Sequence, residues 1–237
     1  MTRRRELHVM YTNMNPDSEP WNIALVDNDA LVRSYLETYL GGLPEFNICW
    51  SMQSGRDAVE AYHHSIACTN CVPDLIVTDL SMHGMSGFEL CATIRFENDH
   101  TPILGCSSYM IEPYERDAVN NGMQGLLLKN ELAQLADGMR TLLSGQPLLK
   151  SNGMPYETPQ QAHERLLMQG KPAIMSMSPN EQAVMELCSE GLSTRTIAEE
   201  TGDSESTVKT YISRAMRKLR AKSRAEAVAS WSRKTKL

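Results

Sequence analysis

Two groups of acidic side chains come straight after apolar runs of the kind that form buried strands. Asp27, Asn28 and Asp29 follow the first run, and Asp79 follows a Leu-Ile-Val-Thr run. Carboxylate and amide oxygens with no cysteine or histidine nearby suit a hard cation such as Mg²⁺. If the two positions meet in the fold, the sequence predicts a magnesium site there.

A hydroxyl and a cation occupy comparable positions in two later runs. Ser107 ends the fourth apolar run, and Lys129 follows the fifth. An ammonium group there can pair with a phosphoryl oxygen or with Asp79. A carboxylate, a divalent ion, a cation and a hydroxyl are the parts that phosphoryl transfer to a carboxylate requires.

Five apolar runs alternate with segments of helical length in the first two thirds of the chain. Strands are expected at Ile23–Val26, Phe46–Trp50, Leu75–Thr78, Pro102–Ser107 and Gly125–Leu128, and helices at Ala30–Leu40, Arg56–Ser65, Gly87–Glu97, Tyr114–Asn121 and Glu131–Leu143. Parallel neighbours need helical crossovers, so this alternation predicts an α/β fold with a doubly wound, five-stranded parallel sheet. Such sheets bind ligands beyond the carboxyl ends of their strands, where the side chains above would converge.

The first expected helix carries an apolar stripe at spacings of three and four. Its members are Leu31, Val32, Tyr35, Leu36 and Tyr39. This spacing is typical of a helix that packs one side against a core. We therefore expect these five side chains to face the sheet.

Four helix-start signals follow one another in the last sixty residues. Ser178-Pro-Asn-Glu181 and Ser223-Arg-Ala-Glu226 are capping boxes, and Ser193 and Ser204 can cap two helices between them. A short glycine-containing turn separates the second helix from the third. This arrangement predicts a small all-α domain with a helix-turn-helix.

The third of these helices is expected to present a basic face. Its buried stripe is Val208, Ile212, Ala215 and Leu219, so the outward residues are Ser206, Thr207, Lys209, Thr210, Ser213, Arg214 and Arg217. A helix of this kind fits the major groove of DNA. We expect base contacts from Lys209, Thr210 and Ser213, and phosphate contacts from Ser206, Thr207, Arg217 and Lys218. The alternative is a solvated basic surface.

Length and charge support a chain of two parts. The 237 residues suffice for one to two domains, and the net charge of −6 is unevenly spread. Residues 21–144 carry 6 Lys and Arg against 16 Asp and Glu, whereas residues 178–237 carry 11 against 8. We expect a flexible segment at 1–20, a first domain at 21–144, a linker at 145–177 with a short helix at Gln160–Met168, and a second domain at 178–237. No apolar run is long enough to cross a membrane, and the six cysteines are irregularly spaced, so we expect a cytoplasmic protein.

The first domain resembles a two-component receiver domain with a flavodoxin-like fold. The segments that carry the resemblance are Leu25–Asn28, Asp74–Asp79, Met82–Gly87, Pro102–Ser107 and Leu127–Lys129. It implies that Asp79 accepts a phosphoryl group from a sensor histidine kinase. It further implies Mg²⁺ binding by Asp27, Asn28, Asp79 and the Ser81 carbonyl, with Ser107 as the switch hydroxyl and Lys129 as the ion partner.

Three residues depart from the usual receiver pattern. Asn28 stands where the family usually has a second acid, which should weaken Mg²⁺ binding, although an amide oxygen can still coordinate. His83 replaces a common proline. Leu126 stands where a switch aromatic often lies, so we expect no coupling through an aromatic rotamer.

The second domain resembles the LuxR-type helix-turn-helix of the NarL/FixJ response regulators over residues 178–232. Ser178–Glu181, Glu190–Ser193, Ile197–Glu199, Ser204–Lys209, Arg217–Leu219 and Ser223–Ala227 carry this resemblance. The two resemblances together imply a transcription factor, not an enzyme, in which phosphorylation controls dimerisation and binding to double-stranded promoter DNA, with RNA polymerase as a further partner. The fourth helix would supply a homodimer contact through Val228, Ala229 and Trp231.

Two other functions compete with this interpretation. Asp27-Asn-Asp29 superficially fits the Asp-x-Asp motif of haloacid-dehalogenase-type phosphatases, with Asp27 as nucleophile. That family usually has Thr or Val where this chain has Leu31, and it needs an acidic pair on a later strand, which this sequence lacks. Alternatively, Asn28 and Leu126 would suit a DNA-binding protein with an atypical receiver, which acts as a constitutive dimer or a ligand sensor without phosphorylation. The segment Thr207–Leu219 also resembles the promoter-reading helix of sigma factors, which the preceding receiver argues against.

A cysteine pair offers a different metal site. Cys68 and Cys71, with His63 and His64 just before them, can in principle supply four zinc ligands. A single Cys-x-x-Cys without a second pair is weak evidence, so we expect two reduced thiols in a loop.

Overall fold

The computed structural model describes residues 19–68, 71–82, 84–170, 177–219 and 221–235. Residues 1–18 of the expected flexible segment, His83 and residues 171–176 of the expected linker lie outside the described residues. No helix within the described ranges is both long enough and apolar enough to span a membrane.

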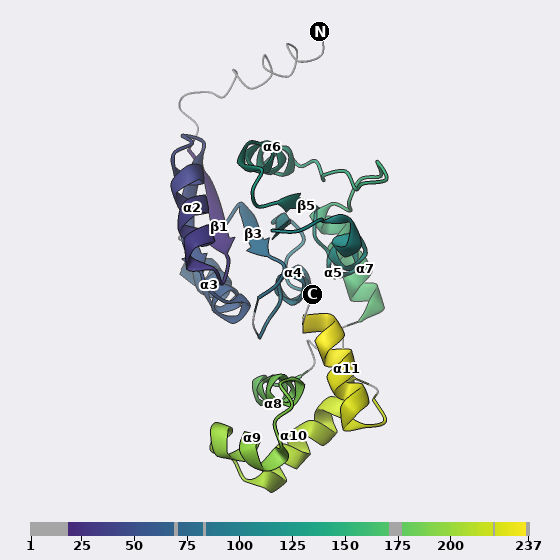
Figure 1. Cartoon of the computed structure of the whole chain (residues 1–237). Helices are drawn as coiled ribbons and strands as arrows, with labels where there is room; N and C mark the ends of the chain where they lie inside the picture. Colours follow the sequence, from purple (N-terminus) through teal and green to yellow (C-terminus); the bar gives the residue numbers. More distant parts are fainter. Residues whose placement is uncertain (1–18, 69–70, 83, 171–176, 220, 236–237) are drawn as a thin grey trace.

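A five-stranded parallel sheet forms the first unit, as predicted, with the strand order β2-β1-β3-β4-β5 (Figure 1). The strands are β1 (Trp21–Val26), β2 (Phe46–Met52), β3 (Leu75–Asp79), β4 (Ile103–Ser107) and β5 (Gly125–Leu128). Val26 pairs with Thr78, Asp79 with Cys106, and Ser107 with Leu128. The carboxyl ends of four neighbouring strands are therefore level with one another.

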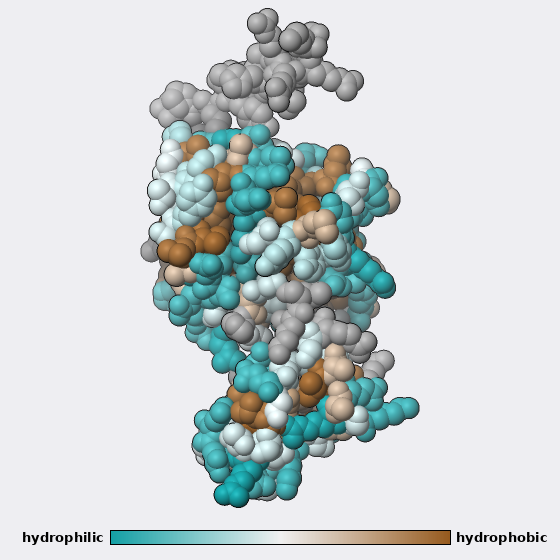
Figure 2. Space-filling model, viewed as in Figure 1, coloured by the Kyte–Doolittle hydropathy of each residue, from teal (hydrophilic) through white to brown (hydrophobic). Residues whose placement is uncertain are grey.

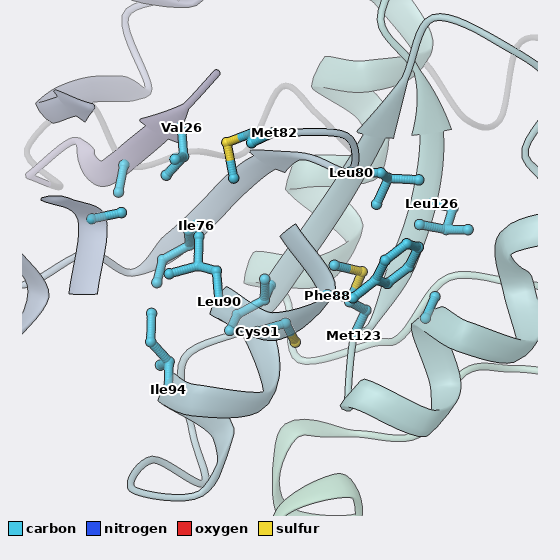
Figure 3. Packing of buried hydrophobic residues seen from close by; sticks show 14 of the residues in the cluster. Val26, Ile76, Leu80, Met82, Phe88, Leu90, Cys91, Ile94, Met123 and Leu126 are labelled. Atoms are coloured by element: carbon cyan, nitrogen blue, oxygen red, sulfur yellow. The ribbon is translucent and has the colours of Figure 1, made fainter. Parts of the chain in front are cut away.

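Helices cover both faces of this sheet. They are α2 (Ala30–Gly41), α3 (Gly55–Cys68), α4 (Gly87–Arg95), α5 (Glu115–Asn121) and α6 (Leu132–Leu143), with a short 3₁₀ turn at Glu112–Tyr114. One core lies between the sheet and α3, α4 and α5 and includes Ile76, Phe88 and Leu126. Figure 3 shows Phe88 beside Leu126 in this core. The other core lies under α2 and α6. Helices on opposite faces make this the doubly wound fold.

Helix α2 differs from its predicted packing. Leu36 and Leu40 are buried, but Leu31 and Tyr35 are 83% and 59% exposed. The helix packs on β1 and on β2, which is one of the two edge strands of the sheet. A helix over an edge buries a narrow side, so the predicted stripe is wrong for Leu31 and Tyr35.

The short helix expected at Gln160–Met168 within the linker is confirmed as the eleven-residue helix α7 (Pro159–Gln169). Thr158 and Gln161 form a capping box, and proline occupies the first turn. Ala162 and Leu166 of α7 are buried, and the helix packs on α4 and α5. The region after α6 is therefore folded onto the first unit as far as Gly170.

Four helices form the second unit. They are α8 (Pro179–Ser189), α9 (Thr194–Thr201), α10 (Glu205–Lys218) and α11 (Arg224–Thr235). Ser178, Ser193 and Ser204 cap the first three, as their spacing predicts. Their apolar sides enclose one core that includes Val184, Ile197, Ile212 and Trp231. In the view of Figure 2, hydrophilic side chains make up most of the visible surface of these helices, with a few apolar ones among them.

Candidate functional site

Three buried charged side chains meet at the carboxyl edge of the sheet. The Nζ atom of Lys129 lies 2.7 Å from Oδ2 of Asp27 and 2.8 Å from Oδ1 of Asp79. The ends of β1, β3 and β5 contribute one residue each, and each side chain is less than 10% exposed. The fold thus brings together two carboxylates and one ammonium group that are far apart in the chain.

Burial and charge act in opposite directions on this cluster. Burial raises the pKa of Asp79 above its ordinary 3.8, although the hydrogen bond and charge of Lys129 oppose the shift. Burial also acts to lower the pKa of Lys129, but its hydrogen bonds to Asp27 and Asp79 outweigh burial, and the pKa rises above 10.5. Lys129 therefore stays protonated at neutral pH.

Backbone contacts fix the turn that carries Asp27. Its Oδ1 accepts a hydrogen bond from the amide of Asp29 at 2.9 Å, and its carbonyl accepts one from Nη1 of Arg33 at 2.6 Å. The amide of Asp27 donates to the carbonyl of Met52 on the edge strand. Asp29 also caps α2 through its side chain. Hydrogen bonds with Asp29, Arg33 and Met52 thereby hold Asp27 in place at the end of β1.

Close packing fixes the loop that follows Asp79. The amide of Gly87 donates to the carbonyl of Leu80, and the amide of Ser81 donates to the Asp79 carboxylate. A Cβ atom at Gly87 would lie 2.1 Å from the carbonyl oxygen of Asp79. Only glycine leaves room for this approach of α4 to β3. The residue pattern gives no sign of this role for Gly87, because the contact arises only in the fold.

Ser107 lies beside the same cluster, at the end of β4. Its side chain is 6% exposed, and its Oγ accepts a hydrogen bond from the amide of Tyr109 at 3.0 Å. The carbonyl of Ser107 accepts a hydrogen bond from the amide of Lys129. The hydroxyl therefore belongs to the loop that leads to α5, and the backbone ties Ser107 to Lys129.

The oxygen donors at this edge fit Mg²⁺. Two carboxylates already hold the cation of Lys129 between them, so the site is built to surround positive charge. Asn28 is exposed next to Asp27, and the backbone of Ser81 lies next to Asp79 in the loop. Within the described ranges, no three His, Cys, Asp or Glu side chains are grouped to hold a metal ion. A magnesium ion here would take two carboxylates and complete its shell with neutral oxygens.

The cysteine and histidine pairs make separate contacts. Nε2 of His63 lies 2.8 Å from Oε2 of Glu97, whereas Sγ of Cys68 lies 3.6 Å from Nε2 of His64. Cys71 is exposed, and the two residues between the cysteines lie outside the described residues. His63 thus points to a carboxylate on a neighbouring segment.

Helix α10 carries the predicted outward face of the second unit. Val208, Ile212 and Ala215 are buried, as predicted. Ser206, Lys209, Thr210, Ser213, Arg214 and Arg217 are exposed, while Thr207 is partly buried beside the capping Ser204. The exposed surface of this helix therefore combines three cations with three hydroxyl groups.

Lys218, which we expected to contact DNA phosphates, forms an ion pair within the bundle. Its Nζ is 2.5 Å from Oε2 of Glu181, and its side chain is 25% exposed. The same Oε2 accepts a hydrogen bond from the amide of Ser178. Burial acts to raise the pKa of Glu181, but the bonds from Lys218 and Ser178 lower it below the ordinary 4.5. Lys218 ties the end of α10 to the start of α8, a role that the spacing could not reveal.

Helix α11 contradicts one predicted contact. Trp231 is 1% exposed, and its Nε1 donates to Oε2 of Glu186 at 2.8 Å. Val228 is partly buried and Ala229 is exposed. The predicted dimer contact through Trp231 is wrong, because its ring fills the core of the bundle.

Both units match known protein families. Residues 23–139 match the response regulator receiver domain, and residues 175–230 match the bacterial regulatory proteins of the luxR family. Over 215 residues the chain is 25% identical to the nitrate/nitrite response regulator protein NarL of Escherichia coli K12, covering 89% of this chain and 94% of that protein. It is 27% identical over 208 residues to the transcriptional regulatory protein LiaR of Bacillus subtilis, covering 86% and 93%.

A solved structure shows the same fold. A two-component response regulator of the LuxR family from Aurantimonas sp. SI85-9A1 aligns with a TM-score of 0.51 and 20% sequence identity. The alignment covers 62% of this chain and 97% of that one.

Proposed function

Because the chain belongs to the response regulators that join a receiver domain to a luxR-family DNA-binding domain, we propose that phosphorylation of Asp79 controls its binding to promoter DNA. A sensor histidine kinase would supply the phosphoryl group, and a homodimer would bind two half-sites. We place the receiver at residues 21–144 together with the folded segment up to Gly170, and the DNA-binding domain at 178–237. RNA polymerase would be a further partner of the DNA-bound protein.

The ammonium group of Lys129 between two buried carboxylates is the observation that carries this proposal. Attack by an Asp79 oxygen on phosphorus would break the P–N bond of a phosphohistidine, and the leaving imidazole would take a proton. Lys129 would pair with an oxygen of the transferred group, and the Ser107 hydroxyl would donate to another. Mg²⁺, held by Asp27, Asp79, the Asn28 amide and the Ser81 carbonyl, would neutralise phosphoryl charge when bound.

The exposed side of α10 supports the second half of the proposal. Lys209, Thr210 and Ser213 would read base edges in the major groove. Ser206, Thr207, Arg214 and Arg217 would contact backbone phosphates. We leave Lys218 out of this set, because its ammonium group pairs with Glu181.

Labelling with a small radioactive phosphodonor and Mg²⁺ tests the phosphoacceptor. The wild type should take up label, and Asp79→Asn should take up none. Asp137→Asn is a matched control, since this carboxylate lies on α6 and is 63% exposed; it should label like the wild type. Equal labelling of all three proteins would refute the assignment of Asp79.

A phosphorylation-independent regulator is a second candidate, favoured by Asn28 and Leu126. Leu126 is 3% exposed, and its Cδ2 atom would lie 2.5 Å from a Cβ atom at Gly105. The leucine side chain thus fills the space beside β4, and no aromatic ring that could change its rotamer lies at this position. Equal affinity for promoter DNA with and without full phosphorylation would support this candidate and refute control through Asp79.

A further inference from the structure

The segment 147–169, which we call the strap, runs from the end of α6 back over β5 and α5. The amide of Leu148 donates to the carbonyl of Gln124 at 2.9 Å, just before β5. A Cβ atom at Gly125 would lie 2.5 Å from Cδ1 of Leu148, so the leucine packs tightly on the start of that strand. The strap is thereby joined to the start of β5, an outer strand of the sheet.

The strap holds both ends of α5. At its first residue, the carboxylate of Glu115 accepts hydrogen bonds from the amide and the Oγ of Ser151 at 2.6 and 2.9 Å. At the other end, the guanidinium of Arg165 donates to the carbonyls of Val119 and Asn120. A cation at the carboxyl end of a helix satisfies open carbonyls and offsets the helix dipole.

Arg165 is itself held in place. Glu157, also in the strap, accepts hydrogen bonds from Nε and Nη2 of Arg165 at 2.8 to 3.0 Å. Such a paired, forked contact fixes the guanidinium more firmly than a single bond would. Helix α5 has only seven residues and no side-chain cap at its start. So short a helix depends on its neighbours for stability.

The helix of the strap is anchored in the receiver. Ala162 and Leu166 pack beside Gly122, where a Cβ atom would lie 3.4 Å and 3.2 Å from their side chains. Nδ1 of His163 lies 2.7 Å from the carbonyl oxygen of Arg95, at the end of α4. The strap therefore spans from α4 to both ends of α5.

Helix α5 is also the next α-helix after Ser107, and only a loop with a short 3₁₀ turn lies between them. The Ser107 hydroxyl accepts the hydrogen bond from the amide of Tyr109, and the chain reaches Glu115 six residues later. Tyr109 and Met110 in this loop are 78% and 73% exposed. A change in the partner of the Ser107 hydroxyl would thus act on a short loop that leads directly to the strap's first attachment point.

We propose that the strap is the relay between the phosphorylation site and the DNA-binding domain. This inference rests on the proposed function. When the Ser107 hydroxyl turns to the phosphoryl group, the amide of Tyr109 loses its partner, the loop and α5 shift, and the bonds of Ser151 and Arg165 weaken. Release of the strap lengthens the connection to Ser178 from roughly eight residues to roughly thirty-four, and its maximum reach from about 28 Å to about 115 Å. The DNA-binding domains can then pair on DNA.

Amide hydrogen exchange on the full-length protein tests the relay. Phosphodonor and Mg²⁺ should make exchange in residues 147–169 about tenfold faster in the wild type and leave it unchanged in Asp79→Asn. Arg165→Met should show the faster exchange without phosphodonor and should still take up label at Asp79. Arg116→Met is the matched control, because Arg116 is exposed on α5 itself; it should behave like the wild type. Ser151→Ala is a milder second variant, expected to speed exchange about threefold.

The outcomes separate the relay from the function on which it rests. If the wild type takes up label but exchange in 147–169 stays the same, the relay is refuted and the phosphoacceptor stands. If Arg165→Met and Ser151→Ala exchange like Arg116→Met, the relay is likewise refuted. If the wild type takes up no label, the proposed function fails and the relay fails with it.

Discussion

The carboxyl edge of the sheet and the outer side of α10 are built in opposite ways. At the edge, Asp27, Asp79 and Lys129 come from three strands, are almost fully buried and contact one another. On α10, the side chains proposed to bind DNA come from one helix of 14 residues and mostly face solvent. A substitution at the edge should therefore change folding and chemistry together, whereas one on α10 should change binding alone.

Lys129→Met should have the largest effect on stability. It leaves two buried carboxylates facing each other without a cation, which costs about 4 kcal/mol of unfolding free energy at neutral pH. Urea denaturation followed by circular dichroism measures this loss. Lys222→Met removes an exposed ammonium group and should cost less than about 0.5 kcal/mol. Equal stability of the two variants would contradict the view that the edge couples chemistry to folding.

Gly87→Ala should come next. The added methyl group would lie 2.1 Å from the carbonyl oxygen of Asp79, so α4 or β3 must move. We expect a loss of about 3 kcal/mol, together with slower uptake of label from a phosphodonor. Gly41→Ala is the control, because its Cβ atom would meet nothing within 4 Å. Wild-type labelling and stability in Gly87→Ala would show that the edge tolerates displacement.

The Glu181–Lys218 pair makes the stability of the second unit depend on pH. The pKa of Glu181 is lowered on folding, so its stabilisation is complete above the ordinary 4.5 and is lost as the pH falls through the lower folded-state value. Glu181→Gln should cost the bundle about 2 kcal/mol at pH 7 and much less near pH 3. Thermal unfolding across that range measures the difference. Glu200→Gln, at an exposed carboxylate on α9, should leave the wild-type pH profile unchanged.

Arg217→Ala should have the smallest effect, and on binding alone. Loss of one phosphate contact should weaken DNA binding about fivefold and lower the slope of log affinity against log salt by about 1. The stability of the bundle should stay within about 0.5 kcal/mol of the wild type, since Arg217 is exposed. Arg116→Ala in the receiver is the control for the change in charge. A large loss of stability in Arg217→Ala would break the distinction between the two regions.

Residues tied to a regular pattern could be predicted from the sequence. Apolar runs predicted the strands, amphipathic segments predicted the helices, and parallel topology then placed Asp27, Asp79 and Lys129 on one edge. The caps at Ser178 and Ser204 followed from local hydrogen-bonding chemistry alone. Each of these features depends on a short stretch of chain or on one rule about sheets.

Residues that depend on a partner across the fold could not be predicted in this way. Helical spacing placed Lys218 near the DNA side, but it could not show that Glu181 lies across from it. The family resemblance predicts a dimer contact for Trp231, and nothing in the sequence of α11 shows that its ring packs in the core of the bundle instead. The glycines and prolines of 145–177 indicated a linker, although Ser151 and Arg165 carry contacts to α5 that only the packed structure reveals.

The burial of Trp231 makes the second unit optically distinct from the first. The other two tryptophans, Trp21 and Trp50, lie on β1 and β2, so each unit has its own indole groups. In a protein with phenylalanine at positions 21 and 50, tryptophan fluorescence comes from Trp231 alone, next to the carboxylate of Glu186. Unfolding of the DNA-binding bundle can then be timed in the intact chain, separately from that of the receiver.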